Sequence, residues 1–214
     1  GGHKRDRYLT DVVAPFVEWV PICPEVECGL PIPRESMRLV GTLEEHRLKT
    51  GKTGIDHTER MQKWAQQRLD DLKDEELCGF IFKSKSPSSG MRDIKIYSEK
   101  GMPVGKSSGL FARALMERFP YLPVEDEGRL NDAGLRENFI ERVFVYFRWR
   151  QFLKAGGTRK GLVEFHTDHK LLIMAHSEKH MRELGKLVAA PHELDNDQLL
   201  QNYFETMMQG LKLQ

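Results

Sequence analysis

Residues 20–34 stand out in this sequence because they combine thiols and a carboxylate with four prolines. Proline fixes the backbone angle φ and restricts the residue before it, so this segment is expected to be stiff. It would present Cys23, Glu25, Cys28 and Arg34 from one rigid loop. Such an arrangement suits a metal centre or a catalytic site. The alternative is that both cysteines are small buried hydrophobic residues beside a structural turn, since their spacing matches no standard zinc knuckle.

A hydroxyl-rich turn at residues 83–90 is the second segment with chemical potential, and it follows the apolar run at residues 80–82. Ser86, Ser88 and Ser89 offer hydroxyl and backbone N–H donors to an anion, and two lysines lie beside them. A plain solvated turn has the same composition, so this segment by itself indicates little.

The elements that position these segments follow a βα pattern as far as about residue 130. Strands are predicted at residues 17–22, 37–40, 79–82 and 94–97, and helices at 58–77 and 110–119. We therefore predict an α/β domain with a Rossmann-like open sheet over residues 1–130. The proline-rich loop would then follow the carboxyl end of a strand, where open α/β sheets bind ligands.

After residue 130 the strand patterns stop, and we predict an all-α helical domain over residues 131–214. The first helix begins at Asn131 or Asp132 and ends near Gly156, and further helices are predicted at residues 160–175, 178–189 and 196–213. The last helix carries a stripe of methionine, leucine and aromatic residues at helical spacing. A stripe of this kind is a packing face far more often than a ligand site.

The overall composition excludes several classes of function. The 33 Lys and Arg balance 32 Asp and Glu, so the net charge of +1 draws the chain neither to nucleic acid nor to anionic lipid. The apolar stretches fall far short of the roughly 20 residues that a membrane span requires. Three cysteines without a secretory signal pattern indicate reduced thiols or metal ligands and a cytoplasmic location.

Four motifs occur in an order that resembles the thiouracil desulfidase family over most of residues 1–130. They are CPEVECGLPIPRESMRLVG, TGIDHTERM, GFIFKSKSPSSGM and VEDEGRL. The resemblance implies a 4Fe-4S cluster held by three cysteines, with the fourth iron open to the sulfur of a thiolated nucleobase or related small molecule. It implies that Cys23 is a cluster ligand, that Glu25 is the acid or base, and that Ser86 is a hydrogen-bonding partner of the substrate.

The remaining residues of the two segments complete this predicted site. Arg34, Ser88 and Ser89 are predicted to bind the substrate, and Cys28 is the second candidate metal ligand. Ser89 occupies the position of the family's third cysteine, and a serine hydroxyl is a much poorer iron ligand than a thiolate. Cys28 or Cys78 could replace that ligand, although spacing alone decides for neither.

The two ends of the sequence suggest a protein that continues in both directions. The opening GGHKRDRYL resembles the stretch just downstream of the family's first cysteine motif, and the last helical pattern is still running at Gln214. We therefore expect the first cysteine to lie upstream. As given, the sequence is not expected to hold an intact cluster.

The helical half resembles YbgA-type domains through LVEFHTDHKLLIMAHSEKHMRELGKLVA and RENFIERVFVYFRWR. His166 and His169, and likewise His176 and His180, are spaced to share one helix face, which permits a metal site. Solvated or hydrogen-bonded histidines at helix ends are the more frequent outcome. Aromatic and arginine residues at 144–150 could stack on bases, but helical periodicity buries most of those rings first.

Two hypotheses of different classes follow from these residues. The first is an iron–sulfur desulfidase-like enzyme that uses Glu25 and Ser86. The second is a non-catalytic module that has lost the cluster at Ser89, and that binds a ligand or docks to the helical domain. The sequence indicates neither a membrane partner nor an oligomeric state, and it does not favour nucleic acid.

Overall fold

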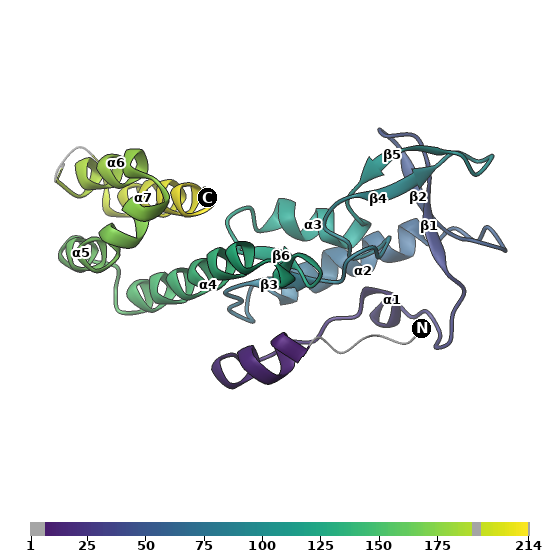
Figure 1. The fold of residues 1–214 in the computed structure, drawn as a ribbon, viewed down its shortest axis with the longest axis horizontal. Helices are drawn as coiled ribbons and strands as arrows, with labels where there is room; N and C mark the ends of the chain where they lie inside the picture. Colours follow the sequence, from purple (N-terminus) through teal and green to yellow (C-terminus); the bar gives the residue numbers. More distant parts are fainter. Residues whose placement is uncertain (1–6, 190–193, 214) are drawn as a thin grey trace. The chain divides into compact units, whose positions relative to one another are not determined.

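The computed structural model describes residues 7–189 and 194–213 of the chain, which divide into two compact units (Figure 1). The described part of the first unit comprises residues 7–77, 81–119 and 125–129. The second unit comprises residues 78–80 and 120–124 and the described residues from 130 onward. The prediction that the protein continues at both ends rests in part on residues 1–6 and 214, which lie outside the described residues.

The sheet of the first unit is open and mixed. It contains β1 (Met37–Gly41), β2 (His46–Thr50), β4 (Ile94–Tyr97) and β5 (Pro103–Ser107), in the order β2-β1-β4-β5. The pairs β1–β2 and β4–β5 are antiparallel, whereas β1 and β4 are parallel, with Leu39 opposite Ile96. The short strands β3 (Phe80–Phe82) and β6 (Val124–Asp126) form a separate pair.

The helices α2 (Thr58–Asp71) and α3 (Leu110–Arg118) pack on each other in this unit, and α2 also contacts β2. Their apolar faces meet through Trp64 and Phe111, whose ring centroids are 5.1 Å apart. Fully buried side chains from both layers form the core, among them Leu39, Leu48, Met61, Ile96, Phe111 and Leu115. An open sheet with flanking helices confirms the predicted α/β class.

The predicted strand at residues 17–22 is wrong. The chain has no regular structure from residue 17 to 23, after the short helical segments η1 (Tyr8–Val13) and η2 (Ala14–Phe16). Pro21 lies inside the predicted strand and has no N–H to donate to a ladder, which disfavours pairing there. The proline-rich loop therefore does not follow a strand. Helix α2 also ends at Asp71, earlier than the predicted residue 77.

The strands that the sequence analysis missed have weak apolar patterns. In β2, His46, Leu48 and Thr50 are buried and alternate with more exposed residues, but only one of the three is aliphatic. The edge strand β5 begins with Pro103 and contains Gly105, two residues that are rare inside sheets. Strand β6 has only three residues.

The described part of the second unit contains four long helices: α4 (Ala133–Lys154), α5 (Arg159–His176), α6 (Glu178–Ala189) and α7 (Asn196–Leu211). Three of them begin at side-chain caps, because Asp132, Thr158 and Asp195 each accept a hydrogen bond from a backbone N–H in the first turn. The turn after α4 contains Gly156 and Gly157 at positive φ, where glycine has no steric penalty. These helices confirm the predicted all-α region.

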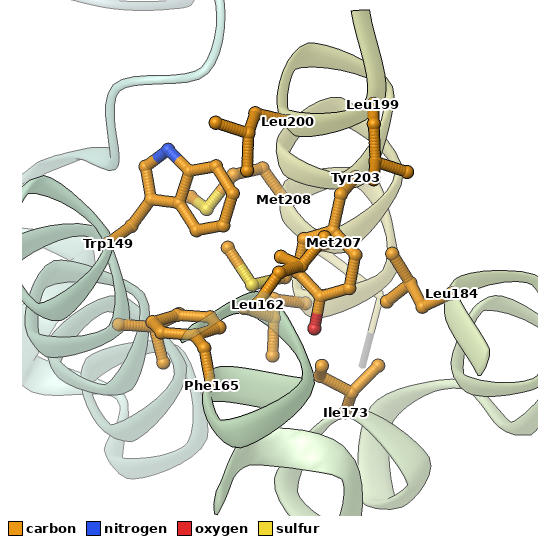
Figure 2. Packing of buried hydrophobic residues seen from close by; sticks show 12 residues of the cluster. Trp149, Leu162, Phe165, Ile173, Leu184, Leu199, Leu200, Tyr203, Met207 and Met208 are labelled. Carbon is orange, nitrogen blue, oxygen red and sulfur yellow. The ribbon is translucent and has the colours of Figure 1, made fainter. Parts of the chain in front are cut away.

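An aromatic and aliphatic cluster forms the core of the second unit (Figure 2). The Trp149 ring lies nearly parallel to that of Tyr203, with the ring centroids 5.6 Å apart. Trp149 and Phe165 meet in a T-shaped arrangement, with the ring centroids 5.2 Å apart. Met207 and Met208 are buried here, which confirms that the stripe on the last helix is a packing face. No helix in the described part of the chain is long and apolar enough to cross a membrane.

Candidate functional site

The proline-rich loop contains one helical turn, α1 (Pro24–Glu27). Glu25 lies on this turn, Cys23 and Cys28 flank it, and Arg34 contacts it through its side chain. Cys23 is the residue before the turn, and Pro24 occupies the first helical position, where its missing N–H costs nothing. The Glu27 carboxylate accepts the backbone N–H of Cys23 at 2.8 Å. It also lies 3.5 Å from the Arg68 guanidinium on α2. The turn is therefore held at both of its ends.

Glu25 is the centre of a hydrogen-bond network in the first unit. Its Oε2 accepts from the Arg34 guanidinium at 2.6 Å. Its Oε1 accepts from the Ser88 hydroxyl at 2.5 Å and from the Ser86 hydroxyl at 3.2 Å. The side chains of Glu25 and Arg34 are 15% and 23% exposed, so the carboxylate is mostly enclosed but still reaches solvent.

The hydroxyl-rich turn folds around Ser86. The Ser86 Oγ accepts the backbone N–H and the hydroxyl of Ser89, each at 3.2 Å. The carbonyl of Ser88 accepts from the backbone N–H groups of Phe111 and Ala112 in the first turn of α3. Ser88 is completely buried, whereas Ser86 and Ser89 are partly exposed. The turn is thus anchored to α3 through Ser88, while Ser86 and Ser89 remain partly exposed.

The structure brings most of the predicted site residues together. Arg34, Ser86 and Ser88 bond directly to Glu25, and Ser89 joins them through Ser86. Cys28 directly follows the helical turn, and its thiol contacts the Glu25 carbonyl at 3.4 Å. The catalytic, substrate-binding and metal-binding roles assigned to these residues remain predictions.

The described residues do not fit a complete set of cluster ligands. Burial raises the pKa of the Cys28 thiol, which disfavours the thiolate that iron requires. At the position where the resemblance implies the family's third cysteine, the chain has Ser89, and its hydroxyl donates a hydrogen bond to Ser86. Among residues 7–189 and 194–213, no group of three or more His, Cys, Asp or Glu side chains is placed to hold a metal ion. We therefore derive no chemical step through a cluster.

The histidine pairs of the second unit have separate partners. His166 meets the Tyr203 hydroxyl at 3.1 Å, whereas His169 bonds to the Phe165 carbonyl at 2.7 Å and to Arg148 at 3.1 Å. Likewise, His176 lies 2.9 Å from the Glu141 carboxylate, and His180 lies 2.7 Å from the Ser177 hydroxyl. These contacts support the expectation of hydrogen-bonded histidines over a metal site.

One carboxylate near the hydroxyl-rich turn was missed in the sequence analysis. Glu127 accepts hydrogen bonds from the backbone N–H of Ser84 at 2.6 Å and from the Ser84 hydroxyl at 3.0 Å. The Lys83 ammonium also contacts it. Glu127 and its partners belong to two of the quoted motifs, because Lys83 and Ser84 lie in GFIFKSKSPSSGM and Glu127 lies in VEDEGRL. The sequence does not show that these two motifs meet, since their contact depends on the fold.

Comparison with known proteins assigns the first part of the chain. Residues 1–127 match the family model of 2-thiouracil desulfurase. The chain belongs to the 2-thiouracil desulfurase family. A solved structure of a [4Fe-4S]-dependent thiouracil desulfidase, TudS, is 28% identical, and the match covers 53% of this chain and 70% of that chain with a TM-score of 0.39.

The second part of this 2-thiouracil desulfurase family member is similar to a different group of proteins. Residues 170–214 match the model of a family of unknown function, DUF1722. The uncharacterized protein YbgA of Escherichia coli (strain K12) is 32% identical over 80 residues, which are 37% of this chain and 46% of YbgA. The chain thus spans about half the length of that relative and joins a thiouracil desulfidase-like part to a YbgA-like part.

Proposed function

We propose that the first unit binds a thiolated nucleobase or a related small molecule and removes its sulfur by hydrolysis. Membership of the 2-thiouracil desulfurase family supports the substrate class. The observation that carries the proposal is the Glu25 carboxylate, held between the Arg34 guanidinium and the hydroxyls of Ser86 and Ser88. TudS is a [4Fe-4S]-dependent enzyme, and Cys23 is the residue of this chain that we propose as a ligand of such a cluster.

The proposed reaction exchanges sulfur for oxygen at one carbon. The oxygen of a water molecule forms a bond to the thiocarbonyl carbon, the carbon–sulfur bond breaks, and sulfur leaves as hydrogen sulfide with the two protons of water. A carbon–sulfur double bond is replaced by a carbon–oxygen double bond, so the carbon keeps its oxidation state and no electrons are gained or lost. The protein has to orient the substrate, take a proton from water and return a proton to sulfur.

Glu25 is the group placed to move these protons. Three donors fix the direction of its carboxylate, which is the condition for a general base to act on a positioned water. Ser86 is partly exposed and is the hydroxyl that we propose to contact the substrate. Because Ser88 is completely buried and bonds to Glu25, its position favours a role in orienting that carboxylate over the predicted contact with substrate.

Turnover of 2-thiouracil by the full-length protein, purified anaerobically and reconstituted with iron and sulfide, tests this proposal. We expect Glu25→Gln to lower kcat about 10²- to 10⁴-fold, because the amide cannot accept a proton. Glu99→Gln is the matched control, since Glu99 pairs with Lys49 elsewhere in the same unit and is 72% exposed. Equal rates of sulfide release from the wild type and Glu25→Gln would contradict the proposal.

A second candidate function is binding without turnover. It is favoured by Ser89, whose hydroxyl takes part in the network around Ser86 at the position where the family resemblance implies a ligand thiolate. This candidate predicts that the reconstituted wild type binds both 2-thiouracil and uracil in calorimetry but releases no sulfide. Sulfide release that depends on Glu25 would exclude it.

A further inference from the structure

We propose that Glu127 is a positioning residue, which sets the course of the turn that carries Ser86 and Ser88. Its carboxylate would act on the reaction through that turn and not by touching the substrate. The inference rests on the proposed function only in so far as the turn faces a substrate. The control of the turn by Glu127 can be tested without one.

The carboxylate of Glu127 anchors the beginning of the turn. Glu127 follows β6, and its backbone N–H donates to the carbonyl of Phe82, the last residue of β3, at 3.2 Å. Both carboxylate oxygens then bond to the next two residues after β3, through Ser84 N at 2.6 Å, Ser84 Oγ at 3.0 Å and the Lys83 ammonium. Hydrogen bonds to an ionised acceptor are stronger than neutral ones, and this side chain is only 16% exposed.

The residue between the anchor and the site explains why an anchor is needed. Lys85 has a φ of 60°, in the left-handed region that disfavours residues with a side chain. A chain released from Glu127 would therefore tend to leave this conformation. Because Lys85 lies directly between Ser84 and Ser86, such a change would move the Ser86 hydroxyl away from Glu25.

The other end of the turn is held independently of Glu127. The N–H of Gly90 donates to the Ser86 carbonyl at 2.7 Å, and the N–H of Gly109 donates to the Gly90 carbonyl at 2.8 Å. The α3 contacts of Ser88 lie on this side as well. Loss of the Glu127 anchor is therefore expected to loosen the turn from its β3 end while leaving α3 in place.

The charge of Glu127 is suited to this task. Burial by itself would raise the pKa of its carboxyl, but the bonds from Lys83 and Ser84 outweigh burial and hold the pKa below its usual value. The carboxylate stays ionised at neutral pH, and both of its oxygens can accept hydrogen bonds from Lys83 and Ser84.

Amide hydrogen exchange on the full chain, without ligand, tests the positioning directly. The variants are Glu127→Ala, the conservative Glu127→Gln, which retains one acceptor oxygen, and Glu99→Ala, a control that removes another lysine contact from the same unit. We expect exchange at residues 84–90 to accelerate about tenfold in Glu127→Ala, less in Glu127→Gln, and less than twofold in the control. Unchanged exchange in Glu127→Ala, or acceleration spread over the whole unit, would overturn the inference.

Kinetics with 2-thiouracil give the functional readout. A displaced Ser86 is expected to raise KM and lower kcat together, so that kcat/KM falls about tenfold in Glu127→Ala and partly recovers in Glu127→Gln. A kcat/KM equal to that of the wild type would overturn the positioning role. If the wild type itself shows no turnover, the proposed function fails, and the exchange experiment still decides whether Glu127 controls the turn.

Discussion

The Glu25 network of the first unit and the aromatic core of the second unit are held by different kinds of contact. The network joins residues 61 and 63 positions apart through directional hydrogen bonds on loops and a single helical turn. The core joins four long helices through closely packed apolar side chains, among them Trp149, Tyr203 and Met207. Hydrogen bonds require a particular geometry, whereas apolar burial depends mainly on area and volume.

This difference separates function from stability in the two units. An intramolecular hydrogen bond contributes about 0.5–1.5 kcal/mol net, because the unfolded chain bonds to water instead. Burying a large apolar side chain contributes about 1.5–3 kcal/mol, and cavities add to the cost of its removal. Changes in the network should therefore affect ligand chemistry more than folding, and changes in the core the reverse. The following predictions test this separation.

Trp149→Ala should have the largest effect on stability. It removes a ring that contacts Phe165, Tyr203 and Phe204, so we expect the free energy of unfolding of the second unit to fall by about 3–5 kcal/mol. Urea denaturation measures this loss, and calorimetry with 2-thiouracil should show an affinity within twofold of the wild type. A large loss of affinity would show that the core of the second unit also affects ligand binding by the first unit.

Arg34→Met should have the opposite profile. The methionine retains the apolar part of the side chain but removes the guanidinium that orients Glu25, so we expect kcat/KM to fall about tenfold. The free energy of unfolding should change by less than about 1 kcal/mol, because the ion pair is partly exposed. Lys49→Met, which removes an ammonium that pairs with Glu99 and is 22% exposed, provides a comparison outside the network. A strongly destabilised Arg34→Met protein would contradict the claim that changes in the Glu25 network affect ligand chemistry more than folding.

Asp132→Ala tests a polar contact that serves stability alone. Asp132 caps α4 by accepting the N–H of Leu135 at 3.0 Å, and loss of such a cap costs about 1 kcal/mol. Thermal unfolding should show the decrease, while Asp132→Asn, which keeps an acceptor, should lose less. Equal losses in both variants would indicate that the negative charge, and not the cap geometry, supports α4.

Mild acidification should have the smallest effect. Burial lowers the pKa of His166 and of His169, so below pH 6.5 the unfolded chain binds more protons at these positions than the folded second unit does. The stability of that unit should therefore fall as the pH drops from 7.5 to 5.5. Urea midpoints at the two pH values measure the change, and a His166→Gln/His169→Gln variant should show a weaker dependence. A stability that rises on acidification would contradict this assignment.

The sequence predicted the second unit better than the first. Long helices with repeated apolar spacing and Asp or Thr caps are local features, so the positions of α4 to α7 followed from the residues themselves. In the first unit, the apolar run at residues 17–22 does not form a strand, whereas the charged segment His46–Thr50 does. Short strands depend on partners that are distant in the sequence, and local pattern identifies them poorly.

The candidate site shows the same division. Residue types and motifs were enough to select Glu25, Arg34 and the serines of the turn, because rigid prolines and clustered hydroxyls are visible in the sequence. Only the tertiary structure decided that Ser88 is buried against Glu25 and that Glu127 holds Ser84 from 43 residues away. The physical reason is that a hydrogen bond exists only at a definite distance and angle, and the folding of distant segments sets both.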